Sequence, residues 1–516
     1  MKSALKVVRG GFFVLAAMFG IGKIYCQDSK VPVRIASVEY EISGSFWKLK
    51  KAALEKELLL DTKKIFKDEE ELSGYLKIKE QNLRDNRSIK ESAQISYSLL
   101  AEENGIIPAA VTVRAENSKT FIAAPYPKYS SSKGFEAKIK MKDSNFLGSL
   151  YPLEGEISYL FPSSGSCEPQ TFNAALSGGY VFPLKEGFLS PWFSGQYTAK
   201  STDDRYEKNS GFVSGGTEFL LPVTSIFSLK TGLSAGLVYD YEVPEDFPYM
   251  SFSASAAAPI LLAENEAAGK ILFTPKVAFT QNTAFHSAGG AVSLPEYEYL
   301  KSPSVELGAE FSLGAVHWKE NFRDGFSFSA SVSMQNCFYD FSQDFFSSVQ
   351  AQFHKAFTWS GISARGNFLA GRTEQKIGRR ENAALTDFVR GVGAQEKETF
   401  YATDLAFILN LDFPVRIFST ISTFGKARED KKERLLDFEV HASPFIDFAY
   451  ARFGAGNSKT ADGICTAGLE LICWPLSFRS IQLRASFGKD FSSTIFSAGG
   501  RPGSGYELTI GIGLFY

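Results

Sequence analysis

The chain has 516 residues, of which 44% are hydrophobic, 22% charged and 14% aromatic, and its formal net charge is −2 at pH 7. This balance excludes a helical membrane protein and a wholly disordered chain, and it does not indicate a nucleic-acid partner. Phe, at 47 residues, outnumbers Tyr, at 21, and Gly reaches 44, a composition that favours β-strands joined by turns.

Residues 1–26 are typical of a secretory signal peptide. Basic residues at the start precede a short apolar stretch, Gly11–Gly22, which is too short to span a bilayer. We therefore expect export and cleavage near Cys26. Lipidation of Cys26 is the less favoured alternative, because the Lys-Ile-Tyr sequence before it lacks the usual Leu and small residues.

Residues 31–117 predict a small α+β domain. Alternation predicts a strand over 33–42 that ends at Gly44, and helical spacing predicts a helix over 49–59. Asp68 followed by Glu71 predicts a capping box that opens a second helix. Two further alternating segments follow, Ile95–Leu99 and Ala109–Ala115. The order β-α-α-β-β indicates a domain with its own core.

Residues 118–133 are expected to be a linker, and from residue 134 to 516 the pattern becomes one of long alternating strands joined by polar turns. Strands of this length match the transmembrane strands of a β-barrel. The pattern yields 17 candidate strands. Because single-chain bacterial barrels have an even number, we predict a mainly β protein with a 16-stranded antiparallel transmembrane β-barrel, in which one candidate within residues 326–371 is either half of a split strand or not a strand.

The last segment is the clearest strand. Its apolar side chains alternate with Glu507, Thr509 and three residues of Gly or Phe. The apolar set can face lipid, and we expect it to act as a C-terminal strand signal: Tyr506, Leu508, Ile510, Ile512, Leu514 and Tyr516. A soluble β-sandwich would show the same alternation, but the strands are too many and too long for a second buried face.

A polar connection, residues 372–399, carries the sequence Phe-Val-Arg-Gly-Val at 388–392. Five strand-like segments follow it, and the second contains Phe-Ile-Asp-Phe-Ala at 445–449. Together with the strand, helix pair and closing strand Val111–Glu116 near the N-terminus, these motifs resemble the BamA/TamA-type outer-membrane insertase superfamily. Residues 31–117 resemble its POTRA domain, a periplasmic module.

The resemblance implies that the loop after residue 371 folds into the barrel lumen, where Arg390 pairs with Asp447. Val389, Arg390, Gly391 and Asp447 would then form a lumen loop clamp. An Arg in a confined lumen requires a partner, and the planar guanidinium matches a carboxylate. The chain departs from the family at Val392, where an aromatic is expected, and at Ala449, where Gly is expected.

The resemblance also implies a function and a location. We expect an outer-membrane barrel with its N-terminal domain in the periplasm, which assists the insertion or translocation of other proteins. Its partners would be outer-membrane lipids, unfolded client proteins, and periplasmic chaperones or accessory lipoproteins. The alternative is a passive channel or a structural barrel whose periplasmic domain binds a partner.

No enzyme, cofactor or metal site is predicted. The Gly-Leu-Ser-Ala-Gly sequence at 232–236 lies inside a long alternating strand, whereas a nucleophile elbow requires a strand-to-helix turn. The four His residues have no neighbours at metal or triad spacing. The cysteines after Cys26 lie far apart without a Cys-x-x-Cys pair, so neither a zinc site nor a disulfide framework is predicted.

Overall fold

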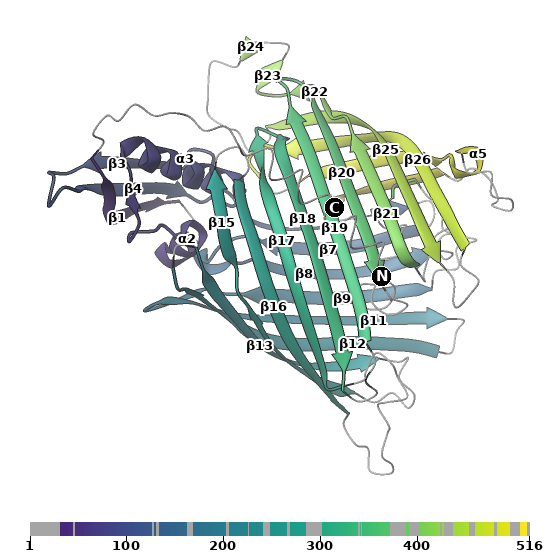
Figure 1. The fold of residues 1–516 in the computed structure, drawn as a ribbon. Coiled ribbons are helices and arrows are strands. Elements are labelled where there is room, and N and C mark those ends of the chain that lie inside the picture. Colours follow the sequence, from purple (N-terminus) through teal and green to yellow (C-terminus); the bar gives the residue numbers. More distant parts are fainter. Residues whose placement is uncertain are drawn as a thin grey trace, which may run out of the picture.

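The structure, a computed structural model, contains an N-terminal domain and a large closed β-sheet (Figure 1). It describes residues 31–44, 47–125, 128–130, 134–162, 169–202, 206–224, 226–240, 248–265, 269–284, 302–338, 341, 343–371, 389–391, 403–423, 426–427, 437–453, 460–478, 482–495 and 506–512. The signal-peptide prediction for residues 1–26 lies outside the described residues. Among the described residues, none of the helices is long and apolar enough to cross a membrane.

The N-terminal domain has a four-stranded sheet in the order β2-β1-β4-β3, in which β1 and β4 are parallel. Its elements are β1 (Val33–Ser43), α2 (Lys51–Leu58), β2 (Ile65–Phe66), α3 (Glu69–Asp85), β3 (Gln94–Leu99) and β4 (Ile107–Glu116). All five predicted elements are therefore present, with the two-residue β2 in addition. Side chains from both helices and from β1 and β4 form one core, which includes Leu54, Leu72, Leu83 and Val111.

The capping box that opens α3 is present. The Asp68 side chain accepts a hydrogen bond from the Glu71 N–H at 2.8 Å, and Glu71 Oε2 accepts the N–H of Lys67 at 2.8 Å. These bonds satisfy backbone donors that the first helical turn cannot pair. At the end of β1, Gly44 has φ +125°, and a Cβ there would lie 1.8 Å from Asn117 Oδ1, so only Gly fits this turn.

The second sheet contains 22 strands, and it closes on itself because β28 pairs with β6. In chain order the strands are β5 (Phe121–Pro125), β6 (Lys128–Ser130), β7 (Gly134–Asp143), β8 (Leu153–Pro162), β9 (Gln170–Gly179), β10 (Phe182–Leu184), β11 (Gly187–Thr202), β12 (Tyr206–Pro222), β13 (Ser228–Asp240), β14 (Tyr249–Ala257), β15 (Ile260–Asn265), β16 (Gly269–Ala284), β17 (Ser304–Lys319), β18 (Phe322–Cys337), β19 (Gln343–Ala356), β20 (Gly361–Gly371), β21 (Thr403–Asp412), β22 (Val415–Ser419), β25 (Phe438–Phe453), β26 (Thr460–Pro475), β27 (Leu483–Asp490) and β28 (Tyr506–Ile512).

Three short elements complete the described chain: η1 (Phe146–Gly148), the hairpin of β23 (Ser422–Thr423) and β24 (Lys426–Ala427), and α5 (Ser492–Ile495). The hairpin forms a separate two-stranded sheet. Neighbours throughout the closed sheet are antiparallel, so the predicted antiparallel barrel is present in its coarse features.

The prediction of 16 strands differs from this sheet. Four pairs of strands, β5/β6, β9/β10, β14/β15 and β21/β22, occupy one position each, because both members pair with the same neighbour in continuous register. The 22 strands therefore fill 18 positions in the described part of the chain. Pro259 and Pro414 lie at two of the breaks, where a residue without an N–H interrupts the ladder.

Residues 118–133 are not simply a linker. Residues 121–125 and 128–130 form β5 and β6, which pair with β7 and supply the position that makes the total even. From residue 134 onward the described strands fill 17 positions, the number of candidates that the pattern gives, and the described part of residues 326–371 contains no split or surplus strand, since β18, β19 and β20 are separate neighbours there. The even number is reached by adding the β5/β6 position before residue 134, and not by merging two strands after it.

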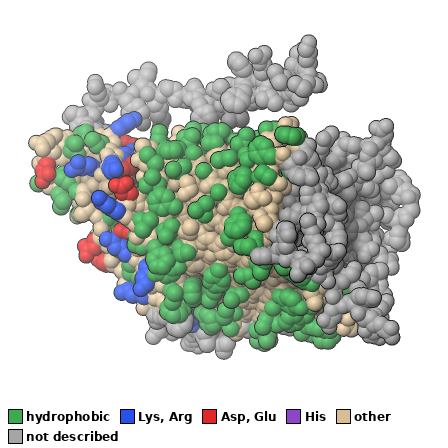
Figure 2. Space-filling model, turned by 90° about the horizontal axis from the view of Figure 1, so that it is seen from below, with side chains coloured by type: hydrophobic (Ala, Val, Ile, Leu, Met, Phe, Trp, Pro, Cys, Tyr) green, Lys and Arg blue, Asp and Glu red, His purple; other side chains and the backbone are tan. Residues whose placement is uncertain are grey.

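Large hydrophobic side chains alternate along the outer face of the barrel (Figure 2). Ile139 on β7, Val213 on β12 and Leu233 on β13 are each at least 60% exposed, while their neighbours in sequence face the lumen. Figure 2 also shows Lys, Arg, Asp and Glu gathered at the left, the side on which the N-terminal domain lies in Figure 1. The barrel therefore has an apolar outer band on the face that Figure 2 shows.

Candidate functional site

The loop tip, Val389–Gly391, is the described part of the connection between β20 and β21. It lies inside the barrel against the strands that follow it in sequence. Alternation along β25 places Asp447 in the lumen, since its neighbour Ile446 is 44% exposed on the outer face and Asp447 itself is fully buried. The structure thus brings the loop tip and Asp447 together.

Arg390 binds Asp447 through three hydrogen bonds. Its Nε donates to Asp447 Oδ2 at 2.9 Å, its Nη2 donates to Oδ1 at 2.7 Å, and its backbone N–H donates to Oδ2 at 2.9 Å. Arg390 is only 1% exposed. This is the bidentate geometry that the guanidinium favours, with the loop backbone added as a third donor.

Two further carboxylates share the same guanidinium. Arg390 Nη1 donates to Asp412 Oδ1 on β21 at 2.7 Å and lies 3.3 Å from Glu470 Oε2 on β26. Below it, the ring of Phe445 is 3.9 Å from the guanidinium carbon. Arg484 on β27 donates in turn to Glu470. We call Arg390 with Asp412, Asp447 and Glu470 the clamp.

Sequence reasoning missed the roles of Asp412 and Glu470. Asp412 is the last residue of β21, and Glu470 occupies an inward position of β26. An acidic residue at an inward strand position was the available signal. The register of β21, β25 and β26, which brings the three carboxylates together, could not be obtained from it.

Val389 anchors the apolar side of the loop tip. It is 2% exposed and packs with lumenal side chains from three strands, Ala406, Ile408, Ala449 and Ile464. Ala449 replaces the Gly that the family motif would place there, and it is fully buried in this cluster. Phe388 and Val392, which flank these residues in the motif, lie outside the described residues.

Gly391 completes the contact between the loop tip and the wall. Its N–H donates to Glu507 Oε2 on β28 at 3.2 Å, and its φ is +83°. A Cβ on Gly391 would lie 2.9 Å from the backbone of Gly488 on β27. Glycine is therefore required here by both the backbone conformation and the close approach.

The predicted C-terminal strand signal alternates as expected where it is described. Tyr506, Leu508 and Ile510 are 61%, 36% and 47% exposed on the outer face, whereas Glu507 and Thr509 are buried in the lumen. Ile512 is the last residue of β28. Leu514 and Tyr516 lie outside the described residues.

The barrel closes through a short seam between β6 and β28. In the described chain only two residue pairs join these strands, Ser130 with Thr509 and Tyr129 with Ile510. On its other side, β28 forms seven pairs with β27, from Lys489–Tyr506 to Leu483–Ile512. Among the described residues, the junction of β28 with β6 is therefore shorter than its junction with β27.

A second group of contacts joins the N-terminal domain to the barrel. Asp85 Oδ2, at the end of α3, lies 2.7 Å from His317 Nδ1, and Asp85 Oδ1 accepts the N–H of Trp318 at 3.0 Å. The Arg87 guanidinium lies over the rings of Trp318, at 4.2 Å, and Trp474, at 5.0 Å. We call the contacts of Asp85 and Arg87 with His317, Trp318, Glu320, Asn321 and Trp474 the rim junction.

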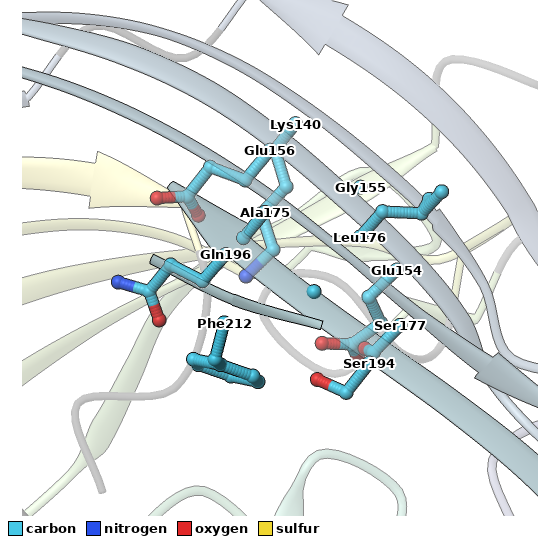
Figure 3. A pocket seen from close by; sticks show the side chains of 11 residues that line it. Lys140, Glu154, Gly155, Glu156, Ala175, Leu176, Ser177, Ser194, Gln196 and Phe212 are labelled. Carbon is cyan, nitrogen blue, oxygen red and sulfur yellow. The ribbon is translucent and has the colours of Figure 1, made fainter. Parts of the chain in front are cut away.

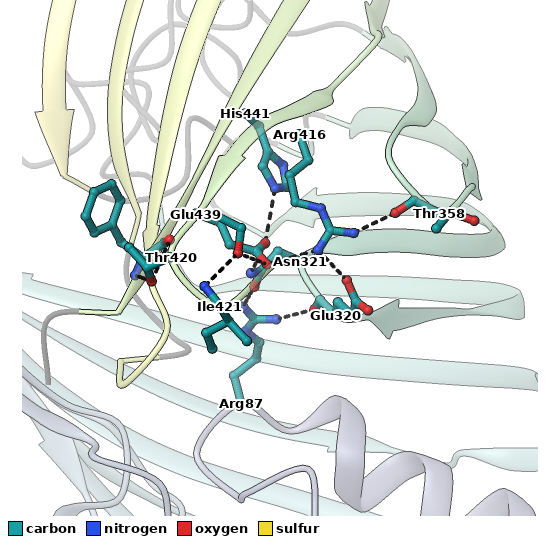
Figure 4. Close-up of polar contacts among 11 residues, drawn as sticks. Arg87, Glu320, Asn321, Thr358, Arg416, Thr420, Ile421, Glu439 and His441 are labelled. Carbon is teal, nitrogen blue, oxygen red and sulfur yellow. Dashed lines mark hydrogen bonds and ion pairs between the residues drawn. The ribbon is translucent and has the colours of Figure 1, made fainter. Parts of the chain in front are cut away.

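The rim junction continues into a polar network on the barrel (Figure 4). Arg87 donates to the Glu320 carbonyl at 3.2 Å and to Asn321 Oδ1 at 2.9 Å, and Asn321 donates to Glu439 Oε2 at 2.9 Å. Arg416 donates to Glu439 at 3.0 Å and to Glu320 at 2.8 Å. Nothing in the sequence pattern indicated these contacts, because the two partners of Arg87 lie more than 230 residues from it and the other pairs join different strands and turns.

The domain also contacts other turns at the same end of the barrel. Lys79 on α3 lies 3.6 Å from Glu264 at the end of β15, and Lys56 on α2 donates to Ser190 on β11 at 2.8 Å. Near β7, Asn145 donates to the Trp47 carbonyl at 2.7 Å. The N-terminal domain is therefore attached at several separate points around this end of the barrel.

A pocket of about 130 Å³ lies on the lumenal wall of β7 to β12 (Figure 3). Its charged side chains are Lys140, Glu154 and Glu156, and both acids already pair with Lys residues of β7. The Ser of the Gly-x-Ser-x-Gly sequence, Ser234, lies within β13 opposite Gly216 and Ser253. It is not in a strand-to-helix turn.

No family model matches the chain, and no curated protein matches it. Among solved structures, it is similar to CdiB from Acinetobacter baumannii at 9% identity, over 93% of this chain and 74% of that chain, with a TM-score of 0.48. It is similar to CdiB from Escherichia coli at 11% identity, over 93% and 76%, with a TM-score of 0.46. It is also similar to BamA from Haemophilus ducreyi lacking POTRA domains 1–3, at 13% identity, over 93% and 84%, with a TM-score of 0.32. At such identities and TM-scores, the function must be argued from the residues of this chain.

Proposed function

We propose that this protein is an outer-membrane barrel that assists the insertion or translocation of other proteins, with its N-terminal POTRA-like domain in the periplasm. The observation that carries the proposal is the seam. A closed sheet whose other strands form long ladders has one junction of two residue pairs among its described residues. In the described part of the chain this junction has the fewest backbone pairs to break, so we expect it to separate first and expose two strand edges.

The outer face supports the membrane location. Hydrophobic side chains such as Phe353, 53% exposed, and Ile157, 55% exposed, would be costly in water and favourable against acyl chains. The same alternation places Ser, Gly and charged side chains in the lumen. Outer-membrane lipids would thus contact the barrel along its whole apolar band.

The mechanism follows from strand edges. An unfolded client would pair its backbone with β6 or β28 after the seam separates, or with β3, which ends the sheet of the N-terminal domain. Main-chain hydrogen bonds would guide the client without ATP, because an exposed edge is a template for another strand. Periplasmic chaperones or accessory lipoproteins would deliver clients to the N-terminal domain.

The clamp would hold the loop tip while the seam separates. Arg390 ties the tip to β21, β25 and β26, strands that do not border the seam. The clamp would keep the lumenal wall in register and has no catalytic role. Its function is therefore structural support for a barrel that opens at one side.

The test measures the folding rate of a urea-unfolded outer-membrane barrel in proteoliposomes that contain this protein. A Ser130→Cys/Thr509→Cys variant, in a background without the native cysteines, allows the seam to be locked by oxidation and released by reduction. We expect wild-type protein to accelerate folding over empty liposomes, oxidation to abolish the acceleration, and reduction to restore it.

The matched control is Ser312→Cys/Ser329→Cys, a register pair between β17 and β18 that lies away from the seam. Oxidation of this pair should leave the acceleration unchanged. If the correctly folded wild-type protein gives no acceleration, insertion of this kind is excluded. Ion conductance without acceleration would identify the passive channel instead.

A further inference from the structure

Glu507 is the one residue of the seam strand that a described hydrogen bond joins to the loop tip. It lies on β28, where Tyr506 and Leu508 face outward, and it is 7% exposed. Its Oε2 accepts the N–H of Gly391 at 3.2 Å. A carboxylate buried to this extent is stable only when donors surround it, and the tip supplies one.

The tip lies flat against the wall beside Glu507. Gly488 on β27 is the register partner of Glu507, and a Cβ on Gly488 would lie 2.8 Å from Gly391 Cα. Two glycines thus face each other with no side chain between them. This close approach is what brings the Gly391 N–H within reach of the seam strand.

The contact matters because the seam is short. On the side of β6, two residue pairs hold β28 in the described chain. The hydrogen bond from Gly391 to Glu507 comes from a loop tip that the clamp anchors to three other strands. Its contribution to holding β28 in place is comparable with that of the two described seam pairs. Loss of the bond would leave β28 attached through β27 and the two seam pairs.

We infer that Glu507 is a positioning residue that couples the loop tip to the seam, so that breaking of the Gly391–Glu507 hydrogen bond and separation of β28 from β6 favour each other. The inference rests on the proposed function, in which the seam opens. Coupling of this kind is reciprocal, so loosening either element must loosen the other.

The experiment measures the distance between spin labels that flank the seam. Ile157→Cys on β8 and Phe487→Cys on β27 replace side chains that are more than half exposed on the outer face, and every variant carries the same pair of labels. Four strand spacings, roughly 20 Å, separate the two strands across a closed seam, and the register offsets the two residues by about six residues along them, so the labels lie roughly 30 Å apart. Double electron–electron resonance, without any client, then reports the population with a longer distance.

We expect Glu507→Ala to raise the long-distance population about fivefold, the effect of losing one buried hydrogen bond. Glu507→Gln retains an acceptor oxygen and should stay within about twofold of wild type. Gly391→Ala, which displaces the tip from the other side, should raise the population as Glu507→Ala does. Heat-modifiable mobility in gels should show that each barrel remains folded.

The matched control is Glu310→Ala on β17, which removes an exposed carboxylate distant from the tip and should change nothing. A wild-type distance distribution in a folded Glu507→Ala barrel would overturn the inference. So would equal opening in the Ala and Gln variants, because the acceptor oxygen would then be irrelevant. Since no client is present, these results are independent of whether the protein accelerates client folding.

Discussion

The clamp and the rim junction both use an Arg from a connecting segment to grip the barrel, but they differ in burial. Arg390 is 1% exposed and meets carboxylates from three strands, over the ring of Phe445. Arg87 is partly exposed and binds a carbonyl and an amide oxygen, between two Trp rings. The clamp cannot exchange its partners for water without exposing several charges, whereas the rim junction can.

This difference assigns the two attachments different roles. A buried charge that loses its partner is strongly destabilised, so the clamp should persist for as long as the barrel is folded. Neutral acceptors and aromatic faces near water are replaced at modest cost. The N-terminal domain should therefore detach and reattach while the loop tip stays in place.

The largest expected effect comes from Arg390→Ala, which would leave Asp412, Asp447 and Glu470 together without their shared cation. We expect a loss of about 3–5 kcal/mol in the unfolding free energy of the barrel, the usual effect of breaking a buried ion pair. Urea unfolding in detergent micelles measures it. Exchange of the charges, Arg390→Asp with Asp447→Arg, should fail to rescue the variant, because the new Asp would face Asp412 and Glu470.

If Arg390→Ala unfolds at the same urea concentration as wild type, the clamp does not hold the barrel. Restoration of stability by the charge exchange would mean that only Asp447 matters. Either result would remove the contrast with the rim junction.

The next effect in size is that of Gly391→Ala. A side chain at φ +83° is strained, and its Cβ would lie 2.9 Å from the backbone of Gly488, so the loop tip must shift. We expect a loss of about 2–3 kcal/mol in the same unfolding assay. Gly366→Ala on β20 is the matched control, since a Cβ there meets nothing within 4 Å. Equal effects of the two substitutions would contradict the close seating of the tip.

A smaller effect is expected for Arg87→Ala at the rim junction. Loss of the stacked guanidinium and its two hydrogen bonds should weaken domain attachment by about 1–2 kcal/mol, with barrel stability unchanged. The amide of Trp318, which donates to Asp85, should then exchange hydrogen roughly tenfold faster. Arg114→Ala, which breaks an exposed ion pair with Glu41, is the control. A large fall in barrel stability with Arg87→Ala would show that the rim junction is no less essential than the clamp.

The smallest effect is a pH dependence of domain attachment. Burial of Lys79, with Lys270 nearby, lowers the pKa of Lys79 from 10.5 to about 8, against the opposing influence of Glu264. The attached domain therefore binds fewer protons than the detached domain between these values, so attachment should strengthen as pH rises from about 8 toward 10.5. Exchange of the Trp318 amide measures this. Lys79→Met should abolish the pH dependence, and its persistence in that variant would assign it to another group.

Several parts of the molecule were predictable because they depend on local pattern. The α3 capping box needs only Asp68 and Glu71, and the outward face of β28 needs only alternation. The pairing of Arg390 with Asp447 was implied by the resemblance of two motifs to a known family, and not by local pattern. What could not be predicted depends on register and long-range contact. Asp412 and Glu470 reach Arg390 only because of how β21, β25 and β26 align.

The linker and the rim junction show the same limit. Residues 121–130 are too short and too irregular to be identified as strands until β7 pairs with them. Arg87 lies in a short connection that has no pattern of its own. Its partners Trp318 and Trp474 belong to strands far along the chain.

The measurement that tests the account most directly is hydrogen exchange of the wild-type protein in micelles, resolved for residues 389–391, β25 and β28. We predict slow exchange of the Arg390 and Gly391 amides, which donate to Asp447 and Glu507, and faster exchange of β28 than of β25. Exchange of the two loop amides at the rate of an unstructured peptide, or exchange of β28 as slow as that of β25, would contradict a fixed loop tip beside a separable seam.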